Sequence, residues 1–355
     1  MPIDLEQLGW DGAFASALDA AGAPGLTPAR VAIEHNHLYR VYTRDGELLA
    51  EASGSLRHAA AGPDGLPAVG DWVAIRVGGK RAAIHAILPR RSCFARKAAG
   101  DPTQRQVVAA NVDTVLLVSG LDGDFNPRRV ERYLVAAAES GAAPVVVLNK
   151  ADLCPSAADA VETIRAIAPR VPVHATSCAQ PTGLDQLRAY LVPGRTVALL
   201  GSSGTGKSSI INHLLGSERQ QTRRVHRRTS RGRHTTVHRE LMLRPDGGVI
   251  IDTPGMRELR LWDTGQALEA TFDDVDALAG DCRFRDCRHR SEPGCAVREA
   301  VAAGRLPAAR LDHFRRLEIE RTVLQERQQQ LSRMTEARQD QPSRPAARSS
   351  RRLSQ

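Results

Sequence analysis

The stretch Gly201-Ser202-Ser203-Gly204-Thr205-Gly206-Lys207-Ser208 decides the fold, because its chemistry needs a strand before it and a helix after it. Residues 196–200 are a short apolar run typical of a buried parallel strand, and residues 209–216 predict the helix. The glycines let the loop fold tightly, so that its backbone N–H groups and the helix N-terminus face a polyphosphate. Lys207 would reach the β- and γ-phosphates, and the Ser208 hydroxyl would bind Mg²⁺. The alternative, a glycine-rich turn that binds nothing, does not require the flanking elements.

A second motif, Asn149-Lys150-Ala151-Asp152, follows the apolar run 145–148. Its aspartate can accept hydrogen bonds from N1–H and the 2-amino group of guanine, whereas adenine would leave that carboxylate unpaired. Such sites reject the wrong partner strongly, on the order of 10⁴-fold. Asn149 would support the loop, and the Lys150 stem would pack along the nucleotide. Alone, this motif is often only a polar helix start; together with the phosphate loop it predicts a GTP site.

Two further segments complete the predicted nucleotide site. Asp252-Thr253-Pro254-Gly255 follows an apolar run, so Asp252 would hold Mg²⁺ through water and the Gly255 N–H would sense the γ-phosphate. Ser177 and Cys178 follow the strand-like residues 171–175 and would cover the guanine O6. Because the base-recognition segments precede the phosphate loop, the order is that of a circularly permuted GTPase. The same sheet can still form, since strand neighbours are set by packing.

Four residues near the C-terminus have the spacing C-x4-C-x-H-x5-C: Cys282, Cys287, His289 and Cys295. Three thiolates and an imidazole close a tetrahedral Zn²⁺ site with no open position for water, which indicates a structural ion. The alternative is a loop of unligated cysteines. Arginines at 283, 285, 288 and 290 would surround the site with positive charge.

These motifs resemble the ribosome small subunit-dependent GTPase A family, over roughly residues 31–330. The segments that carry the resemblance are 149–152, 201–208, 232–236 and the cysteine cluster. The resemblance implies a circularly permuted GTPase domain, an N-terminal OB-type β-barrel and a zinc-binding C-terminal domain. It also implies a role in late maturation of the small ribosomal subunit, with contacts to ribosomal RNA.

Length and composition agree with this outline. A chain of 355 residues accommodates two or three domains, and a net charge of +9 favours a polyanionic partner. No run approaches the ~18 apolar residues of a membrane span, and the first residues predict no secretory signal. Three scattered cysteines, Cys93, Cys154 and Cys178, fit a reducing cytoplasm.

The N-terminal third predicts a short helix near 12–21 and then strands at 31–42, 47–52, 72–77 and 82–87, typical of a small barrel. Residues 89–105 are interpreted as a basic linker. The barrel residues that could form a basic face with stacking platforms are Arg40, Arg44, Arg57, Arg76, Lys80 and Arg81 with Tyr39, Tyr42 and Trp72. For each aromatic, however, burial in the core is the favoured interpretation.

The segment 217–240 carries eight arginines against two glutamates, where switch I belongs. It predicts either a solvated charged loop or a switch that contacts RNA. Thr235 or Thr236 would supply the second protein ligand to Mg²⁺, and the sequence does not choose between them. Met256 stands where many GTPases place a water-orienting glutamine, so intrinsic turnover should be slow. His234 is the candidate catalytic replacement, or it simply binds RNA.

Helices are predicted at 297–303 and 308–333, with a leucine line along the longer one and a basic, disordered tail after it. The predicted division is: extension, 1–30; OB-type barrel, 31–92; permuted GTPase domain, 106–265; zinc-binding helical domain, 271–333; tail, 335–355. The predicted nucleotide-contacting residues are Asn149, Lys150, Ala151, Asp152, Ser177, Cys178, Gly201, Ser202, Ser203, Gly204, Thr205, Gly206, Lys207, Ser208, Ser209, Thr235, Thr236, Asp252 and Gly255.

The sequence therefore predicts an α/β GTPase that acts as a monomer on the small ribosomal subunit, with GTP, Mg²⁺ and one Zn²⁺. The main alternative is a nucleotide-gated RNA-binding scaffold with negligible turnover. A small-molecule kinase with the same phosphate loop is a second alternative, against which the guanine motif and the arginine run both argue.

Overall fold

A parallel sheet surrounds the phosphate-loop strand in the computed structural model, which describes residues 2–22, 24–98, 101–123, 125–216, 239–252 and 265–339. Its parallel strands are β8 (Thr114–Gly120), β9 (Ala143–Asn149), β10 (Val173–Thr176), β11 (Thr196–Leu200) and β13 (Val249–Asp252). They lie in the order β10-β9-β8-β11-β13, and antiparallel β12 (Glu240–Leu243) borders β13. The predicted α/β architecture and the circularly permuted order of the GTPase segments are confirmed.

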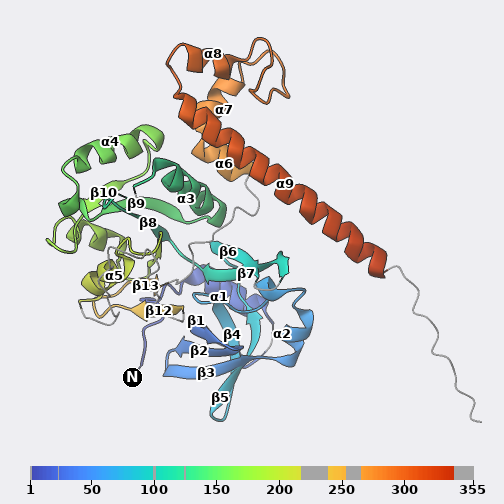
Figure 1. The fold of residues 1–355 in the computed structure, drawn as a ribbon. Helices are drawn as coiled ribbons and strands as arrows, with labels where there is room; N and C mark the ends of the chain where they lie inside the picture. The colour runs from blue at the N-terminus through green and yellow to red at the C-terminus, as the bar shows by residue number, and fades with distance from the viewer. Residues whose placement is uncertain are drawn as a thin grey trace, which may run out of the picture.

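Side chains of successive residues in these strands point to opposite faces, and each face has its own core. Val115 and Leu117 pack with the helices α3 (Pro127–Ser140) and α4 (Ala157–Ile167). Leu116 and Val118 pack with α5 (Lys207–Leu215) and the short helix η3 (Asp185–Tyr190). Figure 1 shows the helices that flank this sheet. Burial on both faces explains why these strands are continuous apolar runs in the sequence.

A closed five-stranded barrel precedes this sheet. Its strands are β1 (Thr27–His35), β2 (Leu38–Thr43), β3 (Gly46–Ala52), β4 (Trp72–Gly78) and β5 (Arg81–Ile87), paired in the order β1-β2-β3-β5-β4 and back to β1. Between β3 and β4 lie α2 (Gly54–Ala59) and the 3-10 turn η1 (Pro63–Gly65). The predicted barrel is therefore confirmed. Tyr39 is buried in the core of the barrel, and Trp72 is buried outside it, against Phe14 of the N-terminal segment.

One predicted barrel strand was wrong in its extent. The run 31–42 is not a single strand, because Asn36 and His37 have positive φ of 50° and 64°. Two successive positive φ values form a tight hairpin turn that matches the twist of the flanking strands. The chain therefore reverses within the run and produces β1 and β2.

The barrel and the parallel sheet are joined into one continuous sheet by a pairing of β1 with β12, at Ile33 and Glu240. The Arg30 guanidinium is buried at this junction, where it donates to the Asn111 carbonyl at 3.1 Å and to Thr196 Oγ1 at 2.8 Å. Helix α1 (Gly12–Ala20) covers the junction with Phe14, whose ring lies 5.8 Å from that of Trp72.

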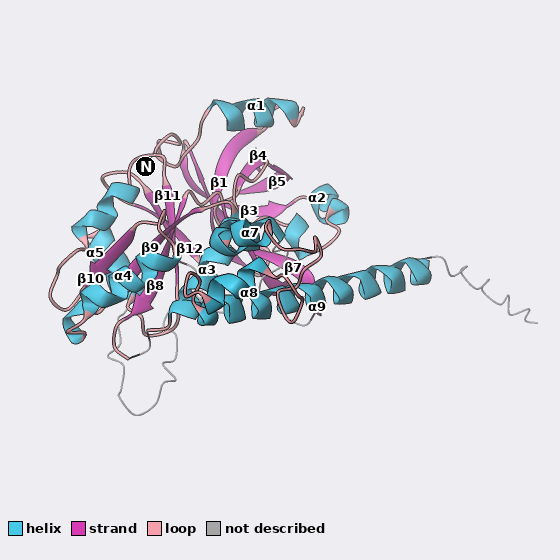
Figure 2. Ribbon diagram, turned by 90° about the horizontal axis from the view of Figure 1, so that it is seen from above, coloured by secondary structure: helices cyan, strands magenta, loops and turns pink. Residues whose placement is uncertain are grey.

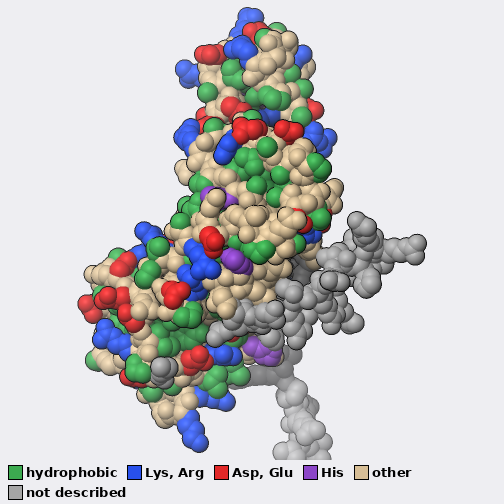
Figure 3. Space-filling model, turned by 90° about the vertical axis from the view of Figure 1, so that its left-hand side faces the viewer, with side chains coloured by type: hydrophobic (Ala, Val, Ile, Leu, Met, Phe, Trp, Pro, Cys, Tyr) green, Lys and Arg blue, Asp and Glu red, His purple; other side chains and the backbone are tan. Residues whose placement is uncertain are grey.

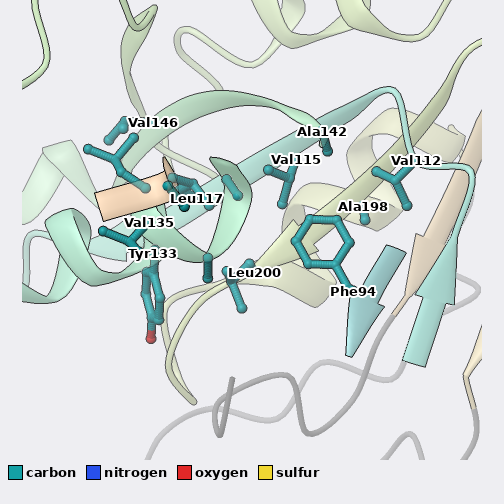
Figure 4. Close-up of a cluster of buried hydrophobic side chains, with 14 of the residues drawn as sticks. Phe94, Val112, Val115, Leu117, Tyr133, Val135, Ala142, Val146, Ala198 and Leu200 are labelled. Atoms are coloured by element: carbon teal, nitrogen blue, oxygen red, sulfur yellow. The ribbon is translucent and has the colours of Figure 1, made fainter. Parts of the chain in front are cut away.

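The predicted linker 89–105 is corrected, because it contains most of a β-hairpin. β6 (Cys93–Ala98) pairs with β7 (Asp101–Ala110) in a separate two-stranded sheet. Phe94 anchors the hairpin, since its ring lies among Val112 and Ala198 of the buried cluster (Figure 4). Burial of this aromatic ring keeps the hairpin against the parallel sheet. The local sequence pattern does not predict that the ring is buried.

A C-terminal module of helices, residues 265–339, completes the described chain. It consists of α6 (Gly265–Thr271), α7 (Asp273–Ala279), α8 (Ala296–Ala302) and α9 (Ala308–Gln339). α6 packs on α3, and α9 extends beyond the body of the molecule (Figure 2). α9 continues six residues past its predicted end at 333 and past the predicted start of the tail. None of the described helices is both long and apolar enough to cross a membrane.

Candidate nucleotide site and metal centre

The phosphate loop, residues 201–206, leads from β11 to the first turn of α5. Gly204 and Gly206 have φ of +78° and +95°, which side chains other than glycine rarely adopt. A Cβ atom on Gly201 would lie 2.2 Å from the Val118 carbonyl oxygen, and one on Gly206 would lie 2.2 Å from Asn149 Nδ2. Three of the predicted glycines are thus required by close packing or by backbone conformation, and the loop sits at the N-terminus of α5 where an anion is stabilised.

Lys207 folds back over this loop. Its Nζ donates to the carbonyl oxygens of Gly201 and Ser202 at 2.7 and 2.6 Å. Those bonds hold the ammonium beside the loop. When a nucleotide binds, the ammonium can donate to phosphate oxygens in place of these carbonyl oxygens. Ser208 and Ser209 follow in the first turn of α5 and are half-buried, as is Ser203 in the loop.

Asn149 connects three of the predicted segments. Its side chain is 1 % exposed, and its Nδ2 donates to the Thr205 carbonyl of the phosphate loop at 2.8 Å. Its Oδ1 accepts a bond from Thr176 Oγ1 at 3.2 Å, at the end of β10. Because an unpaired buried amide is costly, this residue fixes the base-recognition loop, the phosphate loop and the end of β10 in one arrangement.

Asp152 lies beside the loop that was predicted to cover the guanine O6. The Ser177 hydroxyl donates to its carboxylate and accepts bonds from the backbone N–H groups of Ala179 and Gln180, at 3.2 and 3.0 Å. The Cys178 thiol lies 3.7 Å from Asn149 Oδ1, and burial raises the pKa of Cys178, so that it stays protonated near neutral pH. The structure thus brings the predicted base-recognition residues together; Ala151 begins the 3-10 turn η2 (Ala151–Leu153) that presents Asp152.

Asp252 ends β13 and is 6 % exposed. β13 runs parallel to β11, with Ile251 paired to Ala198, so Asp252 comes at the same edge of the sheet as the phosphate loop. That edge is where ligands bind in sheets of this kind. Four predicted residues, His234, Thr235, Thr236 and Gly255, lie outside the described residues.

Sequence reasoning missed two groups that the structure places at this edge. Asp122, in the loop after β8, forms an ion pair with Lys150. From α3, Arg129 Nη1 donates to Ser202 Oγ at 3.2 Å, and the Tyr133 hydroxyl lies 3.3 Å from the same atom. The available signal was the turn sequence Gly120-Leu121-Asp122-Gly123 directly after a buried strand, where parallel-sheet sites collect their residues.

The cysteine cluster of the C-terminal module has the geometry of a zinc site. The four potential ligand atoms of Cys282, Cys287, His289 and Cys295 all lie within 4.8 Å of one another. His289 Nδ1 lies 3.6 and 3.4 Å from the sulfurs of Cys282 and Cys295, which are 4.0 Å apart. Ligands about 2.0–2.3 Å from a tetrahedral ion are separated by roughly 3.5–3.8 Å, so the set fits Zn²⁺.

Local backbone features fix the loop that carries this cluster. Glu292 accepts hydrogen bonds from the N–H groups of Arg288, Arg290 and Ser291, and backbone donors of this turn lower the pKa of its carboxyl to about 2. His289 adopts a positive φ of 56°, and burial lowers its pKa, which keeps the imidazole neutral and able to bind a metal. The arrangement supports a structural ion, since the four protein ligands leave no open position.

Comparison with known proteins agrees with this architecture. The family model described as RsgA GTPase matches residues 87–262. The small ribosomal subunit biogenesis GTPase RsgA of Opitutus terrae is 49% identical over 329 residues, which are 90% of each chain. The protein of the same name from Syntrophotalea carbinolica is 44% identical over 336 residues, 91% of this chain and 92% of its own.

Two solved structures share the fold. YjeQ from Thermotoga maritima has a TM-score of 0.63 at 25% identity, and the match covers 84% of this chain and 99% of that one. YloQ, described as a circularly permuted GTPase, has a TM-score of 0.60 at 24% identity, over 86% of this chain and 97% of its own. Together with the sequence matches over nine-tenths of its length, these findings show that the chain belongs to the RsgA GTPase family.

Proposed function

We propose that this protein hydrolyses GTP to GDP and phosphate on the small ribosomal subunit, assists a late step in maturation of that subunit, and turns over faster on it than alone. Relatives at 44 and 49% identity carry the name small ribosomal subunit biogenesis GTPase. The observation that carries the proposal is the bond from Asn149 to Thr205, which joins the predicted base loop to the phosphate loop. We also propose that the protein acts in the cytoplasm as a monomer.

In this proposal Asp152 selects guanine. Its carboxylate accepts from N1–H and the 2-amino group, while the Ser177 hydroxyl already holds it in place. The loop residues Ser177 and Cys178 cover the O6 side of the base. Pre-positioning the carboxylate reduces the ordering cost of binding and leaves it unpaired when adenine is offered.

Lys207, Ser208 and the phosphate-loop N–H groups hold the phosphates at the N-terminus of α5. Mg²⁺, when bound, neutralises charge on the β- and γ-phosphates. Ser208 would ligate the ion directly and Asp252 through water, and Thr235 or Thr236 would complete the protein ligands. His234 as the group that orients the attacking water is a prediction from the sequence.

The proposed ribosomal contacts involve the barrel and the C-terminal module. The strand order β1-β2-β3-β5-β4 supports a barrel of the oligonucleotide-binding type, and Arg44, Arg57, Arg76 and Lys80 are exposed on it. Arg40 and Arg81 pair with glutamates, Glu47 and Glu51. On the face in Figure 3, basic and acidic side chains are interspersed, so rRNA contacts would be made by local groups of arginines.

The base-recognition part of the proposal is tested with Asp152→Asn. The amide can donate to the 2-carbonyl of xanthine but cannot accept both guanine protons, so GTP binding should fall by roughly 10²-fold or more and XTP binding should rise. Asp159→Asn, an exposed carboxylate near the start of α4, is the control. Equal affinity of the wild-type protein for ATP and GTP would overturn the assignment.

The ribosomal part is tested by GTP hydrolysis with and without small subunits, and by cosedimentation under GTP, GDP and a non-hydrolysable analogue. Stimulated turnover with GTP-dependent binding is the expected result. Nucleotide-dependent binding without turnover would instead support the scaffold alternative. Loss of stimulation in His234→Ala would support the catalytic assignment of that residue, and unchanged stimulation would remove it.

A further inference from the structure

The loop after β8 is shaped to bring a carboxylate onto the lysine of the base-recognition motif. Asp122 and Lys150 form an ion pair in which the side chains are 32 and 23 % exposed. The Leu121 N–H donates to the Asn149 carbonyl at 2.8 Å, which fixes this loop against the base loop. Lys150 itself adopts a positive φ of 63°, so its side chain leaves the backbone in a direction set by the turn.

Gly120 makes room for this contact. A Cβ atom at Gly120 would lie 2.7 Å from the nearer Asp122 carboxylate oxygen and 3.8 Å from Lys150 Cδ. Gly120 does not have a positive φ, so its backbone conformation does not itself demand glycine. Glycine at this position instead leaves space for the Asp122 side chain, which folds back over it toward the ammonium.

We propose that Asp122 is a positioning residue for nucleotide binding, which holds the Lys150 ammonium so that the lysine stem forms a preordered wall of the guanine site. A lysine side chain loses up to about 2 kcal/mol of rotamer freedom when it is fixed. The ion pair fixes it before the nucleotide arrives and so reduces the cost of binding. The inference rests on the proposed guanine site and adds to it a residue outside the Asn-Lys-x-Asp motif.

The effect should be the same for GTP and GDP, because Asp122 acts at the base and not at the γ-phosphate. An interaction that stabilises the bound substrate and the transition state equally affects only binding. Its loss raises KM and leaves kcat unchanged. A partly exposed ion pair contributes little, so Asp122→Asn should weaken both nucleotides by about two- to five-fold. The difference from wild type should shrink as ionic strength rises from about 0.05 to 0.5 M, which a merely structural role would not produce.

The experiment measures dissociation constants of fluorescent GDP and GTP for the full chain and five variants. Asp122→Asn and Gly120→Ala should weaken binding by similar factors, since the added Cβ displaces the carboxylate. The double variant should be no weaker than either single one, as expected for two changes that remove one interaction. Asp122→Glu should retain most of the affinity, and Asp159→Asn is the charge-matched control.

Wild-type affinity in Asp122→Asn, or fully additive losses in the double variant, would overturn the inference. Failure of the guanine site itself gives a different result, because Asp152→Asn would then leave the preference for GTP over ATP unchanged. Adding Asp152→Asn and ATP to the same titrations therefore distinguishes the two failures.

Discussion

Arg310 of α9 donates to Glu131 of α3 at 2.6 Å, and the two side chains are only 5 and 4 % exposed. His313 also contacts the Glu131 carboxylate, and Arg310 bonds Asp274 at 2.6 Å. Burial disfavours the charged guanidinium, but the carboxylates of Asp274 and Glu131 outweigh it and raise the pKa of Arg310. α3 also contacts the phosphate loop through Arg129 and Tyr133, so one helix touches both the nucleotide site and the C-terminal module.

Removing the charge of Glu131 should therefore be costly. Glu131→Gln leaves a buried guanidinium without one of its partners, and breaking such a pair typically destabilises by about 3–5 kcal/mol. Unfolding by urea, followed by the fluorescence of the tryptophans and by circular dichroism, measures the effect. If the C-terminal module and the GTPase domain unfold in separate transitions, the decrease in the free energy of unfolding should be largest for the transition of the C-terminal module.

Glu320→Gln is the matched control. Glu320 pairs with Arg132, also between α9 and α3, but its side chain is 32 % exposed and that of Arg132 is 35 %. A pair exposed to this degree contributes about 0.2–1 kcal/mol. Equal destabilisation by the two variants would show that burial of Glu131 does not determine how much its ion pair contributes to stability.

Gly206→Ala should disrupt phosphate and base recognition together. The new Cβ would meet Asn149 Nδ2 at 2.2 Å, at a φ of +95° that alanine rarely adopts. The bond from Asn149 to Thr205 must then break, so affinity for GDP and GTP should fall by roughly 10²-fold or more. Equilibrium titration with fluorescent nucleotides measures the loss.

Gly216→Ala is the appropriate control, because Gly216 also has a positive φ, of 67°, but a Cβ there has no neighbour within 4 Å. The Gly216→Ala variant should lose some stability at the end of α5, while its nucleotide affinity should stay within about two-fold of the wild-type value. Similar losses of affinity in both variants would mean that backbone strain, and not the clash with Asn149, governs the phosphate loop.

Cys295→Ser should remove the zinc ion and unfold the loop of the C-terminal module. Cys295 is 3 % exposed and immediately precedes α8, so the ion connects that helix to the turn that carries His289. Structural zinc contributes about 10–16 kcal/mol of binding energy in small domains. Metal analysis of the purified chain should give about one zinc per wild-type molecule and well below one in the variant.

Cys154→Ser is the control for thiol loss, because Cys154 lies in the GTPase domain outside the cluster. It should keep its zinc and its resistance to limited proteolysis. Retention of the ion by Cys295→Ser would contradict the four-ligand assignment.

The nucleotide fold was predictable from the sequence because its signals are local. β11 begins and ends at the predicted residues, since an apolar run bounded by a glycine-rich loop leaves little choice. The zinc ligands were predictable for the same reason, because three cysteines and one histidine lie at a fixed spacing within fourteen residues, 282–295. Asn149, too, was predicted to support the base loop.

Other features depend on contacts between distant segments. The hairpin of β6 and β7 was missed because the sequence around the turn between its strands is rich in basic and polar residues. Burial of Phe94, Val108 and Ala109 in the core that they share with the parallel sheet holds it in place. Arg30 gave no sign of being buried, since arginine is usually exposed and its partners lie up to 166 residues away. Asp122 escaped notice because its significance is a pairing with Lys150, 28 residues later in the chain.

The stability contributed by Asp11 should depend on pH. Its carboxylate caps α1 by accepting bonds from Ala13 and Phe14 N–H at 3.1 and 3.2 Å, and it accepts a bond from Arg91 at 2.6 Å. The hydrogen bond from Arg91, with the backbone bonds, holds the pKa of Asp11 below its usual 3.8. A carboxyl whose folded pKa is depressed stabilises fully above its unfolded pKa and loses that contribution as pH falls through the folded value.

Asp11→Asn isolates the charge, because asparagine caps helices about as well as aspartate. The Asp11 and Arg91 side chains are 46 and 49 % exposed, so the variant should lose at most about 1 kcal/mol at pH 7. Thermal unfolding from pH 7 down to pH 3 should show the two proteins converging only below about pH 4. Asp19→Asn, an exposed carboxylate at the other end of α1, should show no such loss, and a constant difference across the whole range for Asp11→Asn would mean that the cap, not the charge, is responsible.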